Sequence, residues 1–193
     1  MALKSGEIKK YWDERAAKQG ARTVGYNNTP LAEEDKRYEE RWAFISPYLN
    51  DVISSDQLVM DYGAGCGRYA KYFNNYIGVD ITKTLVDIAK VDHPDKNFMH
   101  INLYQDLKHL NPTILFCATV LQHNSDQSVN SIISSLPRTL KQFVLYENSQ
   151  ADSGHVKKRT SEQYHAMFGK HYHLENAIFS KSHIIHKEEH TLT

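Results

Sequence analysis

The stretch VMDYGAGCGR, residues 59–68, decides the fold of this chain. Its apolar first half, with the two residues before it, predicts a short buried strand over residues 57–61. Glycines then occupy alternate positions of a turn: Gly63, Gly65 and Gly67. Because glycine has no Cβ, such a turn bends tightly and brings its backbone close to a ligand. We expect a helix over residues 68–73 to follow, with its free N–H groups directed at the same space.

Strands and helices alternate on both sides of this turn. Periodic apolar residues predict helices over residues 35–49, after the N-cap Thr82 and over residues 126–136. Short apolar runs predict further strands over residues 76–80, 97–103, 113–117 and 142–146. This alternation predicts an α/β fold, with a doubly wound, mostly parallel sheet and helices on both faces.

The pattern changes after the last of these strands. Thr160 and Gln163 match a capping box for a short helix that Gly169 ends. Extended stretches over residues 172–179 and 190–193 are expected to supply the last strands, including an antiparallel strand at the C-terminal edge of the sheet.

Composition and charge exclude several classes of protein. The 193 residues, 40% hydrophobic and 24% charged, suit one globular domain. With 23 basic and 23 acidic side chains the net charge is zero, so nothing draws the whole chain toward nucleic acid. The run Lys157-Lys158-Arg159 is expected to be a solvated loop. The N-terminus lacks the apolar core of a signal peptide, and no stretch approaches the ~18 apolar residues of a membrane span. We expect a cytoplasmic monomer or homodimer with no membrane partner.

The side chains around the glycine turn indicate the ligand. A dinucleotide-binding turn needs a third glycine where Arg68 stands, and a P-loop needs a Gly-Lys-Ser/Thr that is missing. Asp61, at the strand end, would repel a pyrophosphate but attract an ammonium group. Asp61 and the expected helix end together suit a ligand with a carboxylate, an ammonium and a sulfonium but no phosphate. These are the groups of the methionine part of S-adenosylmethionine.

The second strand supplies a further contact. Asp80 ends that strand, where a carboxylate accepts hydrogen bonds from both hydroxyls of a ribose. Ile81 follows it and offers an apolar face to a purine.

With these residues in place, the chain resembles the class I S-adenosylmethionine-dependent methyltransferases. MDYGAGCGR matches that family's first motif and YIGVDIT its acidic second motif. FMHINL lies where the family contacts the adenine, and LFCATVLQHNSD and KQFVLYENS resemble its fourth and fifth strands. The resemblance implies the Rossmann-like methyltransferase fold, with S-adenosyl-L-methionine as cofactor and S-adenosyl-L-homocysteine as product.

The resemblance also implies a set of cofactor-binding residues. They are Asp61, Gly63, Ala64, Gly65 and Gly67 around the methionine part, Asp80 and Ile81 at the ribose and purine, Asn102 and Leu103 at the adenine, and the backbone of Cys117 near the amino group. The chain departs from the family's pattern twice, because Asn102 and Thr113 stand where acids are common.

Methyl transfer is an in-line displacement from an activated donor, so the protein mainly aligns the acceptor and excludes water. A general base is needed only where the acceptor must lose a proton. His123, just past the fourth strand, is the candidate base. Glu147 and Asn148 end the fifth strand and are expected to face the same cleft, as a reserve base and an acceptor contact.

The segments outside the core have expected roles as well. Tyr11, Arg15 and Tyr26 are candidate lid or acceptor contacts, because the N-terminal segment is richer in Tyr, Arg and Gly than a plain surface helix. The single domain then divides into an N-terminal helix and lid-like segment (1–30), a cofactor-binding core (31–148) and an acceptor-side segment (149–193). Seven of the eleven histidines follow residue 150 without a closed four-ligand spacing, so no metal site is expected.

The methyl acceptor is expected to be a small molecule methylated on O or N, because no extra domain offers a polymer a surface. A nucleic-acid or protein methyltransferase and a non-catalytic S-adenosylmethionine-binding module are the alternatives. An NAD-dependent reductase is disfavoured by the missing third glycine and by Asp61.

Overall fold

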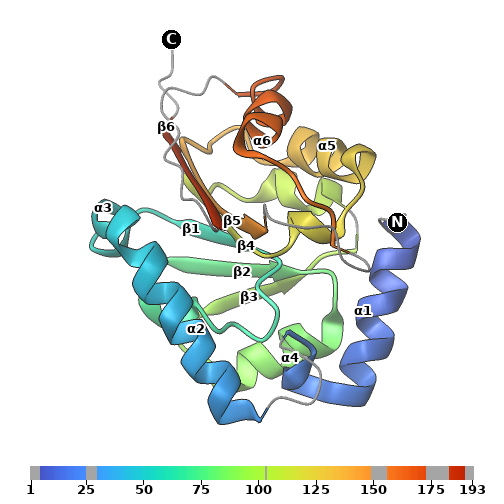
Figure 1. The fold of residues 1–193 in the computed structure, drawn as a ribbon. Coiled ribbons are helices and arrows are strands. Elements are labelled where there is room, and N and C mark those ends of the chain that lie inside the picture. The colour runs from blue at the N-terminus through green and yellow to red at the C-terminus, as the bar shows by residue number, and fades with distance from the viewer. Residues whose placement is uncertain (1–4, 25–29, 103, 149–155, 173–182, 190–193) are drawn as a thin grey trace.

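A central sheet organises the part of the chain that the computed structural model describes, residues 5–24, 30–102, 104–148, 156–172 and 183–189 (Figure 1). Its parallel strands are β1 (Val59–Tyr62), β2 (Tyr76–Asp80), β3 (Asn97–His100), β4 (Ile114–Ala118) and β5 (Gln142–Asn148). A sixth strand, β6 (His183–Glu189), runs antiparallel to β5. The order β3-β2-β1-β4-β5-β6 reverses direction between β1 and β4, which is where open α/β sheets bind ligands.

The parallel, doubly wound sheet was predicted correctly, and each of its five strands lies within a few residues of its expected place. β3 ends at His100, earlier than expected. The stretches expected as last strands, 172–179 and 190–193, fall almost wholly outside the described residues. The antiparallel edge strand therefore stays a prediction at those positions.

Helices cover both faces of the sheet. They are α1 (Ser5–Gln19), α2 (Leu31–Ile45), α3 (Asn50–Ile53), α4 (Lys83–Asp92), α5 (Asp126–Ser135) and α6 (Ser161–Phe168). The capping box of Thr160 and Gln163 begins α6 as predicted, and the Ser125 side chain caps α5. No helix in the described ranges combines the length and the apolar character needed to cross a bilayer.

The helix predicted over residues 68–73 is wrong. Only a short 3-10 helix, η3 (Ala70–Tyr72), follows the glycine turn. The connection from β1 to β2 is close to the minimum for a parallel crossover, roughly a dozen residues. Gly67 has φ of 78°, a left-handed conformation that an α-helix does not continue. Since the turn uses the first part of a short connection, too little chain remains for a full helix.

Aromatic side chains from α2 cover the sheet where that helix was expected. The Trp42 ring stacks on Tyr72 at 4.0 Å and meets Phe73 edge-on at 5.5 Å. Tyr69 packs against Phe116 of β4 at 5.1 Å. These rings bury large apolar surfaces at low conformational cost, so a loop segment forms a stable layer here without helical hydrogen bonds.

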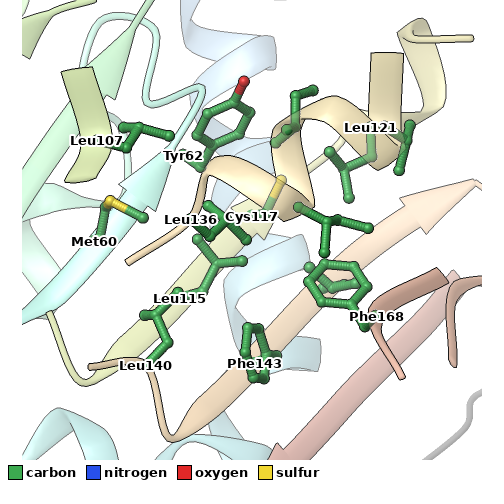
Figure 2. Packing of buried hydrophobic residues seen from close by; sticks show 14 of the residues in the cluster. Met60, Tyr62, Leu107, Leu115, Cys117, Leu121, Leu136, Leu140, Phe143 and Phe168 are labelled. Carbon is green, nitrogen blue, oxygen red and sulfur yellow. The ribbon is translucent and has the colours of Figure 1, made fainter. Parts of the chain in front are cut away.

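Two hydrophobic clusters lie on opposite faces of the sheet. One contains the aromatic layer just described together with Val86 and Ala89 of α4. Figure 2 shows the other, in which Met60 of β1, Leu115 of β4 and Phe143 of β5 pack against residues of the α5 and α6 side. Because the central strands β1 and β4 are covered on both faces, they are buried along almost their whole length.

Candidate active site

A cleft of about 950 Å³, including space open to solvent, lies at the carboxyl ends of β1, β2 and β4. Its walls come from the glycine turn, the ends of these strands, the start of α4, and residues of α1 and α2. The cleft therefore opens at the edge of the sheet predicted to bind the cofactor.

The glycine turn approaches the opposite wall too closely for any larger residue. Gly63 has φ of 78°, and a Cβ added there would lie 2.4 Å from the Cγ2 of Val120. Its N–H donates to the carbonyl of Val79 at 2.8 Å. Gly63 and Ala64 line the cleft, whereas Gly65 and Gly67 shape the turn behind it.

Asp80 lies at the predicted ribose position and also holds the turn. One carboxylate oxygen accepts from the N–H of Gly65 at 2.9 Å and the other from the N–H of Thr82 at 2.8 Å. Asp80 is only 8% exposed but lines the cleft, so its carboxylate is placed to accept from a ligand hydroxyl. Burial raises the pKa of this carboxyl despite the two backbone donors.

Asp61 lies in the same cleft, almost fully buried, and accepts a hydrogen bond of 2.8 Å from the Tyr76 hydroxyl. Burial, with a contribution from Asp80, raises its pKa to about 7. A carboxyl with so high a pKa is stabilised in its ionised form by a cation placed beside it. The predicted ammonium contact therefore has a partner of suitable charge.

The residues expected near the adenine lie in different surroundings. Ile81 lines the cleft. Ile101, the residue before Asn102 in the sequence, lines it as well. Asn102 itself is exposed, and its N–H donates to Asp106. Leu103 lies outside the described residues. Cys117 is fully buried behind the wall, which is formed instead by Ala118 and Thr119.

His123 ends the 3-10 helix η5 (Leu121–His123) and lines the cleft as predicted. Its ring meets Trp12 of α1 edge-to-face, with the ring centroids 5.2 Å apart. This contact joins the candidate base to the N-terminal helix across the cleft.

Glu147 does not face the cleft, and that prediction is wrong. Its side chain is fully buried, and its carboxylate accepts from the N–H groups of Val120, Leu121 and Gln122 at 2.9–3.0 Å. Burial raises its pKa to about 7 in spite of these donors. Glu147 therefore holds the turn that carries His123. Asn148 ends β5, and its side chain lies outside what the structure describes.

Arg159 holds the other side of the same turn, which corrects the expectation of a solvated basic run. It is 1% exposed, donates to the carbonyl of Leu121 at 2.9 Å and to that of Asn124, and pairs with Asp126 at 2.9 Å. Lys157 adds a backbone bond to the Gln122 carbonyl at 2.6 Å. Of the three basic residues, Lys158 is exposed as expected.

Thr119 connects this turn to β4 in a strained conformation. Its φ of 58° is left-handed, which is unusual for a β-branched residue and costs about 1–3 kcal/mol. Its N–H donates to the Tyr146 carbonyl at 2.7 Å. The bonds from Glu147 and Arg159 on either side keep the strained wall in place.

Other residues of α1 than the candidate lid contacts line the cleft. Ile8 and Trp12 of α1 line the cleft. Tyr11 and Arg15 do not, and the Arg15 guanidinium donates to the Tyr11 hydroxyl at 3.2 Å. Tyr26 lies outside the described residues.

Sequence reasoning missed several lining residues, chiefly Tyr38 of α2 together with Arg68 and Tyr69 after the glycine turn. Arg68 and Tyr69 directly follow the glycine turn, and this position in the sequence could have indicated that they contact the cleft. The helix expected over these residues concealed that indication. Nothing in the sequence around Tyr38 links it to the cleft. In the described part of the chain, no group of three or more His, Cys, Asp or Glu side chains is arranged to hold a metal.

Comparison with known proteins shows which of them this chain resembles. No family model matches the sequence. The chain is 26% identical over 177 residues to an uncharacterised methyltransferase, YcgJ of Bacillus subtilis, a match that covers 74% of this chain and 69% of that protein.

Solved structures share the fold at lower identity. A structure of magnesium protoporphyrin IX methyltransferase from Synechocystis with bound S-adenosylhomocysteine is 15% identical, with a TM-score of 0.68 over 95% of this chain and 99% of that one. A phosphoethanolamine N-methyltransferase of Haemonchus contortus is 17% identical, with a TM-score of 0.64 over 82% of this chain and 38% of that one. The strand order, the glycine turn and these likenesses show that the chain has the fold of the class I S-adenosylmethionine-dependent methyltransferases.

Proposed function

We propose that the chain binds S-adenosylmethionine in the cleft and transfers its methyl group to an O or N atom of a small-molecule acceptor. The observation that carries the proposal is the cleft itself. The close-approach glycine turn and two buried acids, Asp61 and Asp80, line one space. Asp61 suits the ammonium of the cofactor and Asp80 its ribose hydroxyls.

When bound, the cofactor supplies an activated methyl group on a sulfonium. The residues of this chain then orient the acceptor, exclude water and hold a proton acceptor at the cleft wall. His123 is the side chain proposed for the last role, because it lines the cleft on the turn held by Glu147 and Arg159. Trp12 and Ile8 of α1 are proposed as the lid that keeps water out.

A thermal-shift series with S-adenosylmethionine, S-adenosylhomocysteine and NAD tests the cofactor class. We expect the two adenosyl amino acids to raise the melting temperature and NAD to leave it unchanged. A shift with NAD alone would refute the proposal. The variant Asp80→Asn serves as the control, since it weakens the ribose contact and should reduce the shift.

The acceptor class needs a separate experiment. Radiolabelled methyl transfer into a cell extract, followed by separation by size, should put the label in the small-molecule fraction. Two solved relatives act on porphyrin and phosphoethanolamine, as their names state, which supports a small acceptor. Label in protein or nucleic acid would favour the polymer alternatives, and binding without any transfer would favour the non-catalytic module.

A further inference from the structure

The turn after β4, residues 119–124, presents two polar side chains to the cleft. Thr119 begins this turn and Asn124 ends it, and both line the cleft. The contacts proposed for the cofactor lie on the glycine turn and at the end of β2, so neither side chain is needed for them. Both side chains are therefore available to a second ligand, which in this cleft is the methyl acceptor.

The Asn124 side chain offers a hydrogen-bond acceptor of fixed orientation. Its Nδ2 donates to the Val120 carbonyl at 2.8 Å. Because a carbonyl oxygen can only accept, the amide nitrogen must face it, and Oδ1 lies on the other side of the amide group. Among the described residues Oδ1 forms no hydrogen bond, and protein atoms do not close it off. The residue is 5% exposed and its carbonyl accepts from Arg159, so this oxygen is held in place at the cleft.

Thr119 presents a hydroxyl at the other end of the turn. The residue is partly buried, and within the described ranges its Oγ1 forms no hydrogen bond. Its φ of 58° carries a strain that a glycine at this position would avoid. Strained residues of this kind gather at active sites and ligand-binding sites. A ligand contact through the hydroxyl gives a physical reason for a threonine here.

The charges around the cleft favour a methyl acceptor without a negative group. Asp61 and Asp80 line the cleft as buried acids. Among its described lining residues, Arg68 is the only arginine or lysine, and its guanidinium is paired with an acid of α2. An anionic group bound here would lose its hydration without gaining a free counter-charge from the protein. A hydroxyl or amino group, in contrast, can donate directly to the oxygens of Thr119 and Asn124.

We propose that Thr119 and Asn124 bind the methyl acceptor, and that they take a hydroxyl or amino group of a molecule that carries no negative charge. This inference rests on the proposed function and deepens it by naming the class of acceptor. The Oδ1 of Asn124 accepts a hydrogen bond from that group, and the Thr119 hydroxyl either accepts from it or donates to it. His123 lines the cleft directly before Asn124 in the chain, so the bound group lies beside the candidate base.

A first experiment tests the two side chains. The small-molecule fraction of a cell extract supplies the acceptor, and transfer of radiolabelled methyl groups is measured at increasing amounts of that fraction. We expect Thr119→Val to raise the apparent KM by ~3- to 10-fold, the effect of losing one neutral hydrogen bond. Asn124→Leu should raise it at least as much. Thr119→Ser keeps the hydroxyl and should recover most of the affinity that Thr119→Val loses. Calorimetry should show the affinity of each variant for S-adenosylhomocysteine within about twofold of the wild type.

The same chain offers matched controls. Thr113 directly precedes β4, at the end opposite the cleft, and among the described residues its buried hydroxyl has no partner. Thr113→Val should therefore leave the apparent KM unchanged. Asn130 of α5 donates to the Asp126 carbonyl at 2.8 Å, as Asn124 does to Val120, but it does not line the cleft. Asn130→Leu removes the same kind of side chain–backbone bond and should also leave the apparent KM unchanged.

A second experiment tests the charge of the acceptor. The small-molecule fraction is passed over an anion-exchange resin at pH 7.5, and methyl transfer into the flow-through and into the eluted anions is compared. We expect the labelled product from the flow-through, which contains the neutral and cationic molecules. Acceptor activity confined to the eluted anions would contradict the proposal.

The outcomes separate this inference from the proposed function. A raised KM in Thr119→Val and Asn124→Leu, with both controls unchanged and the acceptor in the flow-through, supports the inference. An unchanged KM in these two variants, or an equal rise in Thr113→Val and Asn130→Leu, overturns it while the proposed function stands. If the wild type labels no small molecule, the proposed function fails and this inference fails with it.

Discussion

Asp61 has a chemical consequence that can be measured without knowing the acceptor. Burial raises its pKa to about 7, and an ammonium beside it stabilises the ionised form and lowers that pKa. Binding therefore releases a proton below pH 7, and affinity rises with pH until Asp61 is ionised in the free protein. We expect S-adenosylhomocysteine to bind several-fold more tightly at pH 7.5 than at pH 6. In Asp61→Asn this dependence should flatten; an unchanged slope would separate Asp61 from the ammonium.

His123 is the second residue whose role is open to a direct test. If it accepts the acceptor's proton, His123→Ala should reduce turnover by ~10²–10⁴-fold. Affinity for S-adenosylhomocysteine should stay within about twofold of the wild type, because the cofactor contacts lie on the glycine turn and β2. Steady-state kinetics with the acceptor identified in the extract measures the turnover. Calorimetry measures the affinity for S-adenosylhomocysteine. A variant that keeps its rate would leave His123 only a packing role against Trp12.

At the scale of elements, the glycine turn and the turn after β4 form two walls that constrain each other. Gly63→Ala would put a Cβ 2.4 Å from Val120 at a positive φ, so we expect a loss of several kcal/mol of stability or no folded protein. Gly6 of α1 is the matched control, since a Cβ there meets nothing within 4 Å. Gly6→Ala should be neutral or stabilising by up to ~1 kcal/mol in urea unfolding. Equal effects of the two substitutions would contradict the close approach.

The turn over residues 119–124 depends in the same way on the segment that follows β5. Arg159→Met would remove the guanidinium bonds to the Leu121 and Asn124 carbonyls, which should cost about 2–4 kcal/mol in urea unfolding. The exposed neighbour Lys158 provides the control, and Lys158→Met should change stability by less than ~0.5 kcal/mol. A change below ~0.5 kcal/mol in both variants would mean that the basic run is a solvated loop after all.

At the scale of the whole molecule, its buried acids set how stability varies with pH. Asp61 and Glu147 both have pKa values raised to about 7, so the folded state holds protons that the unfolded chain releases. This contribution is fully present below the unfolded pKa values near 4 and is lost as pH rises through about 7. Asp126 acts in the opposite sense, because its pKa is lowered and its contribution is lost only in stronger acid.

Urea unfolding at pH 5.5 and 7.5 measures this effect. We expect the raised pKa of Glu147 to make the wild type lose more stability between the two pH values than Glu147→Gln does. The histidines are the same in both proteins, so their contribution cancels in this comparison. The variant should lose less over the same range, because it lacks one of the buried acids with a raised pKa. Parallel curves for the two proteins would show that Glu147 is ionised throughout.

The sequence by itself determined the parallel sheet, the glycine turn and the places of Asp61, Asp80 and His123, because these follow from local chemistry. Apolar runs predict buried strands, only glycine accepts the positive φ of the turn, and strand ends meet at one edge of the sheet. The tertiary structure alone decided the rest. Whether Glu147 and Arg159 face solvent, ligand or backbone depends on a turn distant in the chain, whose N–H and carbonyl groups they satisfy. The missing helix reflects a crossover in which the glycine turn leaves too little chain for a full helix, and the Trp42 ring of α2 packs on Tyr72 there.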